Sequence, residues 1–157
     1  MLENRVNKEI LKQRLQNETF KRKTLSFYRY VTIENPLGFR DDLFRQWSEL
    51  NCFGRIYVAR EGINAQMSVP EHKLEDFLEK LDSVPCLKEM PIKYALVDNG
   101  KSFYKLTIKV RPKIVADGLD HGTYDLSKVG NHLSALEFHE LAGQPETLVI
   151  DMRNHYE

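Results

Sequence analysis

Apolar residues recur along this chain with two different periods, and the changes of period predict its order of elements. Spacings of three and four residues predict one helix around Leu43–Leu50 and another from Pro70 to Leu81. Alternating or short apolar-rich stretches predict strands over residues 25–32, 55–60, 63–69, 92–97 and 103–110. The chain therefore mixes helices and strands in one core.

The order of these elements is strand, helix, strand, strand, helix and strand, with one more strand near the end. Two helices over one face of an antiparallel sheet is the economical packing for this order, which is the ferredoxin-like βαββαβ plan of α+β proteins. Asn99-Gly100 separates the last two strands, and both residues tolerate positive φ. We therefore expect residues 92–97 and 103–110 to form a hairpin closed by a type I′ turn.

Residues 1–24 form a charged lead-in to this domain. Leu2, Val6 and Ile10 recur at helical spacing, which predicts a helix of about three turns. The segment holds seven basic and three acidic residues, and it ends with the triplet Lys21-Arg22-Lys23. A solvated arm is the interpretation that we prefer, and an arm that binds phosphates is the alternative.

The end of the chain predicts the start of a second domain. Turn residues occupy 112–133, and Ser134 and Glu137 then form a capping box at the start of a short helix that ends at Gly143. The apolar run 148–150 predicts a buried strand, although the domain over residues 25–132 is already complete. We therefore place a truncated domain at 133–157, and expect its strand to be mobile or to pair with a neighbouring molecule.

Composition narrows the class of protein. Of 157 residues, 41% are hydrophobic and 29% are charged, and the formal net charge is zero, which excludes a polycation of the histone type. Apolar runs stay shorter than the roughly 18–20 residues of a membrane helix, and the first residues lack the apolar core of an export signal. Two cysteines cannot make a disulfide framework. These features predict a cytoplasmic protein without a membrane partner.

Candidate chemistry gathers on one face of the predicted sheet. Lys105, Lys109 and Arg111 project the same way from one strand, and residues 101–115 contain five basic residues and no acid. Tyr28 and Tyr30 join this face if Leu25, Phe27 and Val31 point to the core. Aromatic rings beside cations suit stacked bases and phosphates. An ordinary solvated sheet face has the same pattern, so both interpretations stay open.

Two glycine turns are weaker candidates for anion binding. Arg60 and Asn64 flank Gly62 and could position a backbone or base edge, although a plain hairpin is the interpretation that the pattern favours. The segment Gly38–Arg40 begins a helix and is similar to the phosphate loop of acylphosphatases. That family's loop is richer in glycine, however, and Arg60 stands where it has an asparagine.

The remaining nucleophilic and metal-binding residue types are scattered. Cys52 and Cys86 have neither a histidine nor a cationic cluster near them in sequence, so we expect incidental cysteines rather than nucleophiles. The five histidines lack the HxxxH or HExxH spacing of metal ligands. The sequence therefore predicts no catalytic residue and no metal site.

Longer strings resemble one family over nearly the whole chain. The strings, in order, are residues 26–30 (SFYRY), 53–66 (FGRIYVAREGINAQ), 109–111 (KVR), 114–118 (IVADG) and 150–157 (IDMRNHYE). Together they resemble the bacterial rhodanese-domain tRNA uridine hydroxylases. The resemblance implies a ferredoxin-like, acylphosphatase-like domain followed by a rhodanese domain, whose first strand is similar to Asp151-Met152-Arg153.

The resemblance also implies an activity. The family uses molecular oxygen as co-substrate to convert the wobble uridine of certain tRNAs to 5-hydroxyuridine. Its catalytic cysteine lies on a loop far beyond the matched strings, and neither Cys52 nor Cys86 is at its position. We expect this chain to lack the hydroxylation chemistry and to bind tRNA. The alternatives are an interaction domain that docks on its own rhodanese domain and, less favoured, an acylphosphatase-type hydrolase.

Overall fold

The computed structural model describes residues 6–96, 99–115, 125 and 130–151. The chain divides into two compact units, residues 1–126 and 127–157, which are described separately. Among the described residues, no helix is both long and apolar enough to cross a membrane.

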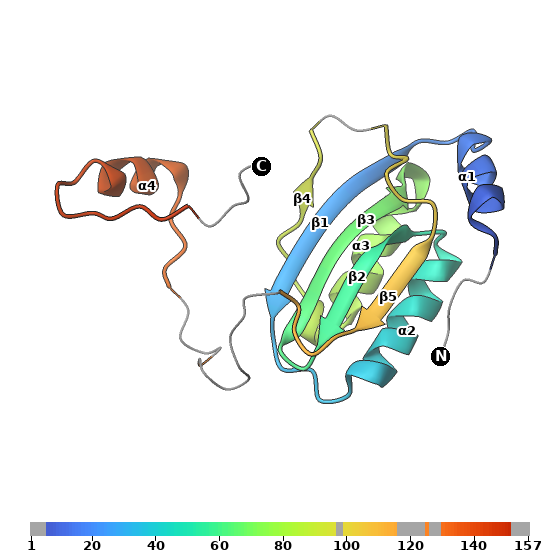
Figure 1. Cartoon of the computed structure of the whole chain (residues 1–157), viewed down its shortest axis with the longest axis horizontal. Helices are drawn as coiled ribbons and strands as arrows, with labels where there is room; N and C mark the ends of the chain where they lie inside the picture. The colour runs from blue at the N-terminus through green and yellow to red at the C-terminus, as the bar shows by residue number, and fades with distance from the viewer. Residues whose placement is uncertain (1–5, 97–98, 116–124, 126–129, 152–157) are drawn as a thin grey trace. The chain divides into compact units, whose positions relative to one another are not determined.

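The first unit contains most of the secondary structure (Figure 1). Its helices are α1 (Lys8–Gln16), α2 (Pro36–Glu49) and α3 (Leu74–Ser83), with 3-10 turns η1 (Glu71–Lys73) and η2 (Pro85–Leu87) around α3. Its strands are β1 (Arg22–Tyr30), β2 (Phe53–Ala59), β3 (Gly62–Pro70), β4 (Lys93–Tyr94) and β5 (Leu106–Val110). The two predicted helices are present, and a strand overlaps each of the five predicted ranges, although β4 covers only Lys93–Tyr94 of residues 92–97 and β5 only Leu106–Val110 of residues 103–110.

The strands form one sheet in the order β4-β1-β3-β2-β5. Strands β4, β1, β3 and β2 pair antiparallel, as in the predicted ferredoxin-like plan, and β5 pairs parallel to β2. The α+β ferredoxin-like prediction is confirmed, with a mixed rather than fully antiparallel sheet.

The predicted hairpin is wrong, because β4 and β5 lie at opposite edges of the sheet (Figure 1). Of the residues between them, 99–105, called the crossing segment below, pass over one end of the sheet instead of turning back (Figure 1). Gly100 has φ of 70°, and a Cβ there would lie 2.7 Å from the carbonyl oxygen of Arg22. The glycine therefore serves the close approach of this segment to β1 rather than a two-residue turn.

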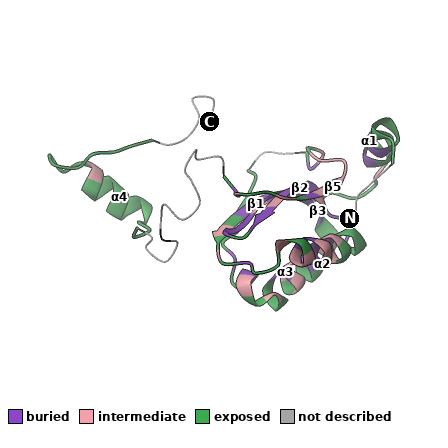
Figure 2. Ribbon diagram, turned by 60° about the horizontal axis from the view of Figure 1, so that its bottom comes forward, coloured by how far each residue is buried: buried purple, intermediate pink, exposed green. Residues whose placement is uncertain are grey.

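One face of the sheet is covered by α2 and α3 (Figure 2). The large buried side chains Trp47 and Phe77 come from these helices, and their rings lie 5.8 Å apart between centroids. The centroid of Phe27 of β1 is 6.3 Å from that of Trp47 and 6.5 Å from that of Phe77. Ile56 and Ile63 add the apolar positions of β2 and β3, and both are fully buried. The opposite face, called the open face below, receives no helix from α2 or α3.

The segment that precedes the sheet is shorter than the predicted lead-in of residues 1–24. Helix α1 forms, and Leu11 and Leu15 are buried, so this helix is packed against the domain rather than being a solvated arm. Strand β1 begins at Arg22, which is 7% exposed. Arg22 therefore belongs to the sheet and not to a free basic triplet.

The second unit contains α4 (Ala135–Ala142), and the predicted capping box is confirmed. Ser134 Oγ accepts from the Glu137 backbone N–H, and the Glu137 carboxylate accepts from the Ser134 N–H. The predicted strand at 148–150 does not form in this chain, and its three residues are exposed. Most of the predicted 112–133 loop and of the Asp151-Met152-Arg153 string lies outside the described residues.

Candidate nucleic-acid interface on the open sheet face

The strand register brings the polar side chains of the open face into rows. Tyr28 pairs with Asn64, Asn64 with Tyr57, and Tyr57 with Lys109, so one row crosses β1, β3, β2 and β5. Residues directly opposite each other on paired strands point to the same face, which makes these four side chains neighbours. The sequence predicted three members of this row and missed Tyr57.

A second row lies two residues further along each strand on the same face. It consists of Lys93, Ser26, Gln66, Arg55 and Thr107, one from each strand of the sheet. None of the open-face positions within the five described strands is acidic. Apart from Arg22, which pairs with Glu18, the open face therefore presents cations with no acidic neighbour on the same strands, a charge pattern that favours anionic partners.

The three predicted phosphate contacts fall around β5. Lys109 lies within the strand, while Lys105 precedes it and Arg111 follows it. Lys105 and Lys109 line one shallow hollow of about 300 Å³ together with Arg55 and Tyr57. The Arg111 guanidinium lies over the Tyr57 ring, 5.7 Å from its centroid. The structure thus brings the predicted cations together and adds Arg55 to them.

Tyr28 and Tyr30 are exposed on the open face, as the alternation in β1 predicts. Their exposed fractions are 54% and 37%. Phe27, which directly precedes Tyr28, is buried on the helix side. Alternation within 53–59 would also have placed Arg55 and Tyr57 on this face, but only if the neighbour of that strand had been known.

The turn between β2 and β3 has mainly a structural role. Gly62 has φ of 147°, and a Cβ there would lie 2.0 Å from the carbonyl oxygen of Arg29, so only glycine fits. The Glu61 carboxylate accepts from the Ile114 N–H at 2.9 Å, and Asn64 Nδ2 donates to the Ile114 carbonyl at 3.3 Å. Asn64 therefore holds the segment after β5, which the sequence did not predict.

Arg60 lies apart from that structural network. Its side chain is 77% exposed, and its guanidinium is 3.7 Å from the Glu34 carboxylate, which is 81% exposed. An exposed pair at this distance adds little stability. Arg60 is thus accessible at the end of the sheet. The side chains of Arg60 and Asn64, which were predicted to act together, do not hydrogen-bond to each other.

The segment Gly38–Arg40 does not form a phosphate loop. The Asn35 side chain accepts from the Gly38 N–H at 3.0 Å, which caps α2. Arg40 is buried, and its Nε donates to the Ile108 carbonyl of β5 at 3.1 Å, while its guanidinium also pairs with Asp41. The contact with Arg40 lowers the pKa of the Asp41 carboxyl below its ordinary value. Because these groups bind each other, this helix start has no acylphosphatase-like anion cradle.

The cysteines have the environment of unreactive thiols. Cys52 is 1% exposed, and burial raises its pKa to about 12. Burial also raises the pKa of the half-buried Cys86. Within the described ranges, no group of three or more histidine, cysteine and acidic side chains is arranged to hold a metal ion.

Comparison with known proteins places the first unit in context. Residues 22–114 match the family described as the UPF0176 acylphosphatase like domain. The chain is 51% identical over 156 residues to the tRNA uridine(34) hydroxylase of Leptospira interrogans serovar Lai, covering 99% of this chain and 42% of that protein. It is 49% identical to the tRNA uridine(34) hydroxylase of Photorhabdus laumondii, covering 100% of this chain and 45% of that protein.

A solved structure, the dark state of the BLUF protein BlrB, is similar to 60% of this chain and 76% of that chain, with 12% identity and a TM-score of 0.41. The curated relatives are longer than this chain, which spans less than half of their length.

Proposed function

This chain belongs to the UPF0176 acylphosphatase-like domain family, and from that premise we propose that it is the tRNA-contacting N-terminal part of a tRNA uridine(34) hydroxylase. One observation carries the proposal. The open face places Tyr28, Tyr57 and Lys109 in one row of the sheet, with Arg111 against the Tyr57 ring. Aromatic rings beside cations on an open sheet bind nucleotides by stacking and by phosphate contact.

We propose that the hydroxylation step belongs to the part of the relatives that this chain does not cover. The thiol of Cys52 is buried with a raised pKa, and Arg40 is bound within the fold, so neither supplies an evident catalytic group. We propose that the whole protein uses molecular oxygen as substrate and that this chain contributes affinity for tRNA. Lys105, Lys109 and Arg111 would contact phosphates, while Tyr28 and Tyr30 would stack on bases and Arg60 and Asn64 would lie at the edge of the site.

The experiment is a titration of this 157-residue chain with tRNA at several salt concentrations. Each phosphate contact contributes about 0.7 to 0.9 to the slope of log affinity against log salt. Replacing Lys105, Lys109 and Arg111 together by alanine should therefore reduce the slope by about 2 to 3.

The matched control removes the same charge from the helix side. Arg45, Lys73 and Lys80 are exposed or half-exposed, and they pair with Asp42, Asp76 and Glu49. Their triple alanine variant should keep the slope of the parent chain. Equal losses from both triples would show that net charge, and not the open face, sets the affinity. An absence of tRNA binding at low salt would favour docking on the rest of the protein instead.

We further propose that residues 133–157 begin a rhodanese domain. Support comes from the exposed apolar side chains of α4 and the segment after it. Leu136 and Phe138 are 67% and 51% exposed, and Leu148 is 81% exposed. Such residues are normally covered in a folded domain. In a chain extended to the length of the relatives, the amides of residues 136–150 should exchange with solvent much more slowly than in this chain, and equal rates would contradict the proposal.

A further inference from the structure

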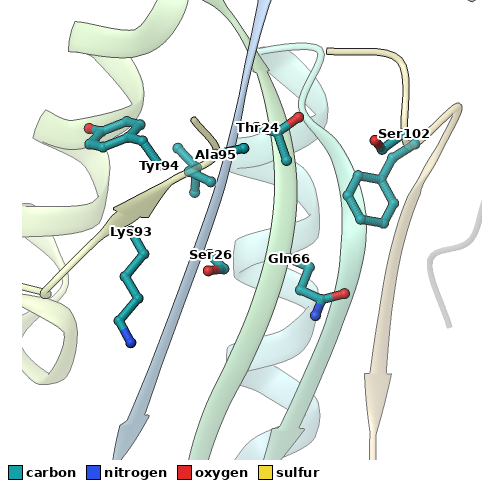
Figure 3. Close-up of a pocket in the computed structure, with 9 residues that line it drawn as sticks. Thr24, Ser26, Gln66, Lys93, Tyr94, Ala95 and Ser102 are labelled. Atoms are coloured by element: carbon teal, nitrogen blue, oxygen red, sulfur yellow. The ribbon is translucent and has the colours of Figure 1, made fainter. Parts of the chain in front are cut away.

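A second hollow lies on the open face, between β1, β3, β4 and the segment that crosses the sheet end (Figure 3). Its volume is about 290 Å³, which is at the lower end of the roughly 300–1,000 Å³ of small-molecule sites. The hollow therefore has room for a single planar ring system rather than for a whole cofactor. The residues that matter for its chemistry are Ser26, Gln66, Lys93 and Phe103.

Three of these side chains stand in one row across three strands. Ser26 of β1 pairs in register with Gln66 of β3 on one side and with Lys93 of β4 on the other (Figure 3). Within the described part of the chain, the Gln66 amide and the Lys93 ammonium have no hydrogen-bond or ion-pair partner in the structure. A carboxamide donates and accepts at once, which is what the polar edge of a nucleobase requires.

Phe103 borders both hollows of the open face. It lines the hollow of Gln66 and Lys93, and it also lines the hollow of Lys105 and Lys109. A half-buried ring between two hollows is a platform on which a base can stack. Cations lie on both sides of this ring, so the backbone of an RNA strand that crosses it would meet positive charge before and after the stacked base.

Resting on the proposed function, we propose that this hollow binds one unpaired nucleobase of the RNA. The base stacks on Phe103, its polar edge bonds the Gln66 amide, and Lys93 contacts an adjoining phosphate. A base inside a duplex does not fit this description, because its edge is paired and its faces are stacked on its neighbours. The substrate feature assigned to this part of the open face is therefore a single-stranded segment.

The test uses the full chain with single-stranded RNA homopolymers, each built from one type of base, and with an RNA duplex of the same length. Phe103→Leu should weaken binding of every single strand by about tenfold, because stacking on the ring is lost. Gln66→Leu should weaken binding of the preferred base by about fivefold and leave the salt slope unchanged. Lys93→Ala should reduce that slope by about 0.7. Duplex affinity should stay the same in the first two variants.

Matched controls keep the test falsifiable. Gln13→Leu in α1 and Phe138→Leu in α4 make the same replacements at exposed positions outside the hollow, and both should leave binding unchanged. Circular dichroism and thermal unfolding would confirm that each variant is folded. Parent-like affinity of folded Phe103→Leu and Gln66→Leu for all single strands would overturn the assignment of this hollow. If the Lys105, Lys109 and Arg111 variant still lost its salt slope, the proposed function would survive, whereas a parent chain that binds no RNA would overturn both.

Discussion

The two ends of the open face use the same residue types for different purposes. At the end where β1 begins, which we call the closed end, the Arg22 guanidinium lies 3.9 Å from the centroid of the Phe53 ring. At the other end, which we call the bare end, Arg111 lies over Tyr57. A cation against an aromatic ring is therefore common to both, and it does not by itself indicate a binding site.

The difference lies in the hydrogen-bond acceptors around each guanidinium. Arg22 pairs with both carboxylate oxygens of Glu18 at 2.7 and 2.8 Å and donates to the carbonyls of Asn51 and Ser68. The Arg111 guanidinium has no such acceptor among the residues that the structure describes. An arginine whose donors are already satisfied holds the fold together, while one whose donors are free can take a phosphate.

The largest expected effect concerns Cys52, which lies between Asn51 and Phe53 at the closed end. Its pKa of about 12 leaves roughly one thiol in ten thousand ionised at pH 8, so labelling by a disulfide reagent should be about a thousandfold slower than for a free cysteine. Because the pKa is raised, the rate should climb with pH well beyond pH 9. If Cys52 in the folded chain were labelled as fast as a small free thiol, solvent would have access to the thiol and the closed end would not be tightly packed.

The next effect tests Arg22 itself. Arg22→Met leaves Glu18 without its partner and removes donors from two backbone carbonyls, so the free energy of unfolding should fall by about 3 kcal/mol. Urea unfolding measures this change. Lys23→Met is the matched control, because Lys23 is 51% exposed and its pair with Glu71 is at the surface, and it should change stability by less than about 0.5 kcal/mol. Similar losses from both variants would contradict the distinction between the two ends.

A smaller effect is expected where the crossing segment meets β1. In Gly100→Ala, the new Cβ would lie 2.7 Å from the Arg22 carbonyl oxygen at a positive φ, which should cost about 1 to 3 kcal/mol. In Gly130→Ala, no heavy atom of the described residues beyond the chain neighbours is within 4 Å of the new Cβ, so that variant should unfold at the same urea concentration as the parent chain. If Gly100→Ala left the free energy of unfolding unchanged, the segment around Gly100 would not pack tightly against β1.

The sequence predicted the parts of the fold that depend on local spacing. Periodicity placed α2, α3 and the first three strands, and alternation placed Tyr28 and Lys109 on the open face. It failed for the hairpin, because Asn99-Gly100 permits a turn, whereas the two edges of the sheet decide where β4 and β5 pair. Local propensity does not determine which edge of the sheet a strand joins.

The same limit explains the errors about individual cations. Besides the nearby Glu18, the two backbone acceptors of Arg22 lie 29 and 46 residues away in the chain, so a basic triplet in the sequence resembled a free arm. Arg55 and Tyr57 were missed because their place beside Lys109 depends on the parallel pairing of β2 with β5. Which cation is available is therefore a property of tertiary contacts, and the candidate site needed the sheet register before it could be completed.

The smallest expected effect on stability is at the bare end, and it separates the two ends most directly. Arg111→Met keeps an apolar stem over the Tyr57 ring and removes only the free guanidinium, so stability should change by less than about 0.5 kcal/mol. The salt slope of tRNA binding should fall by about 0.7, because one phosphate contact is lost. Urea unfolding and titration of the same preparation measure both quantities. A stability loss as large as that of Arg22→Met would mean that Arg111 is a second structural arginine, and an unchanged slope would mean that Arg111 does not contact phosphate.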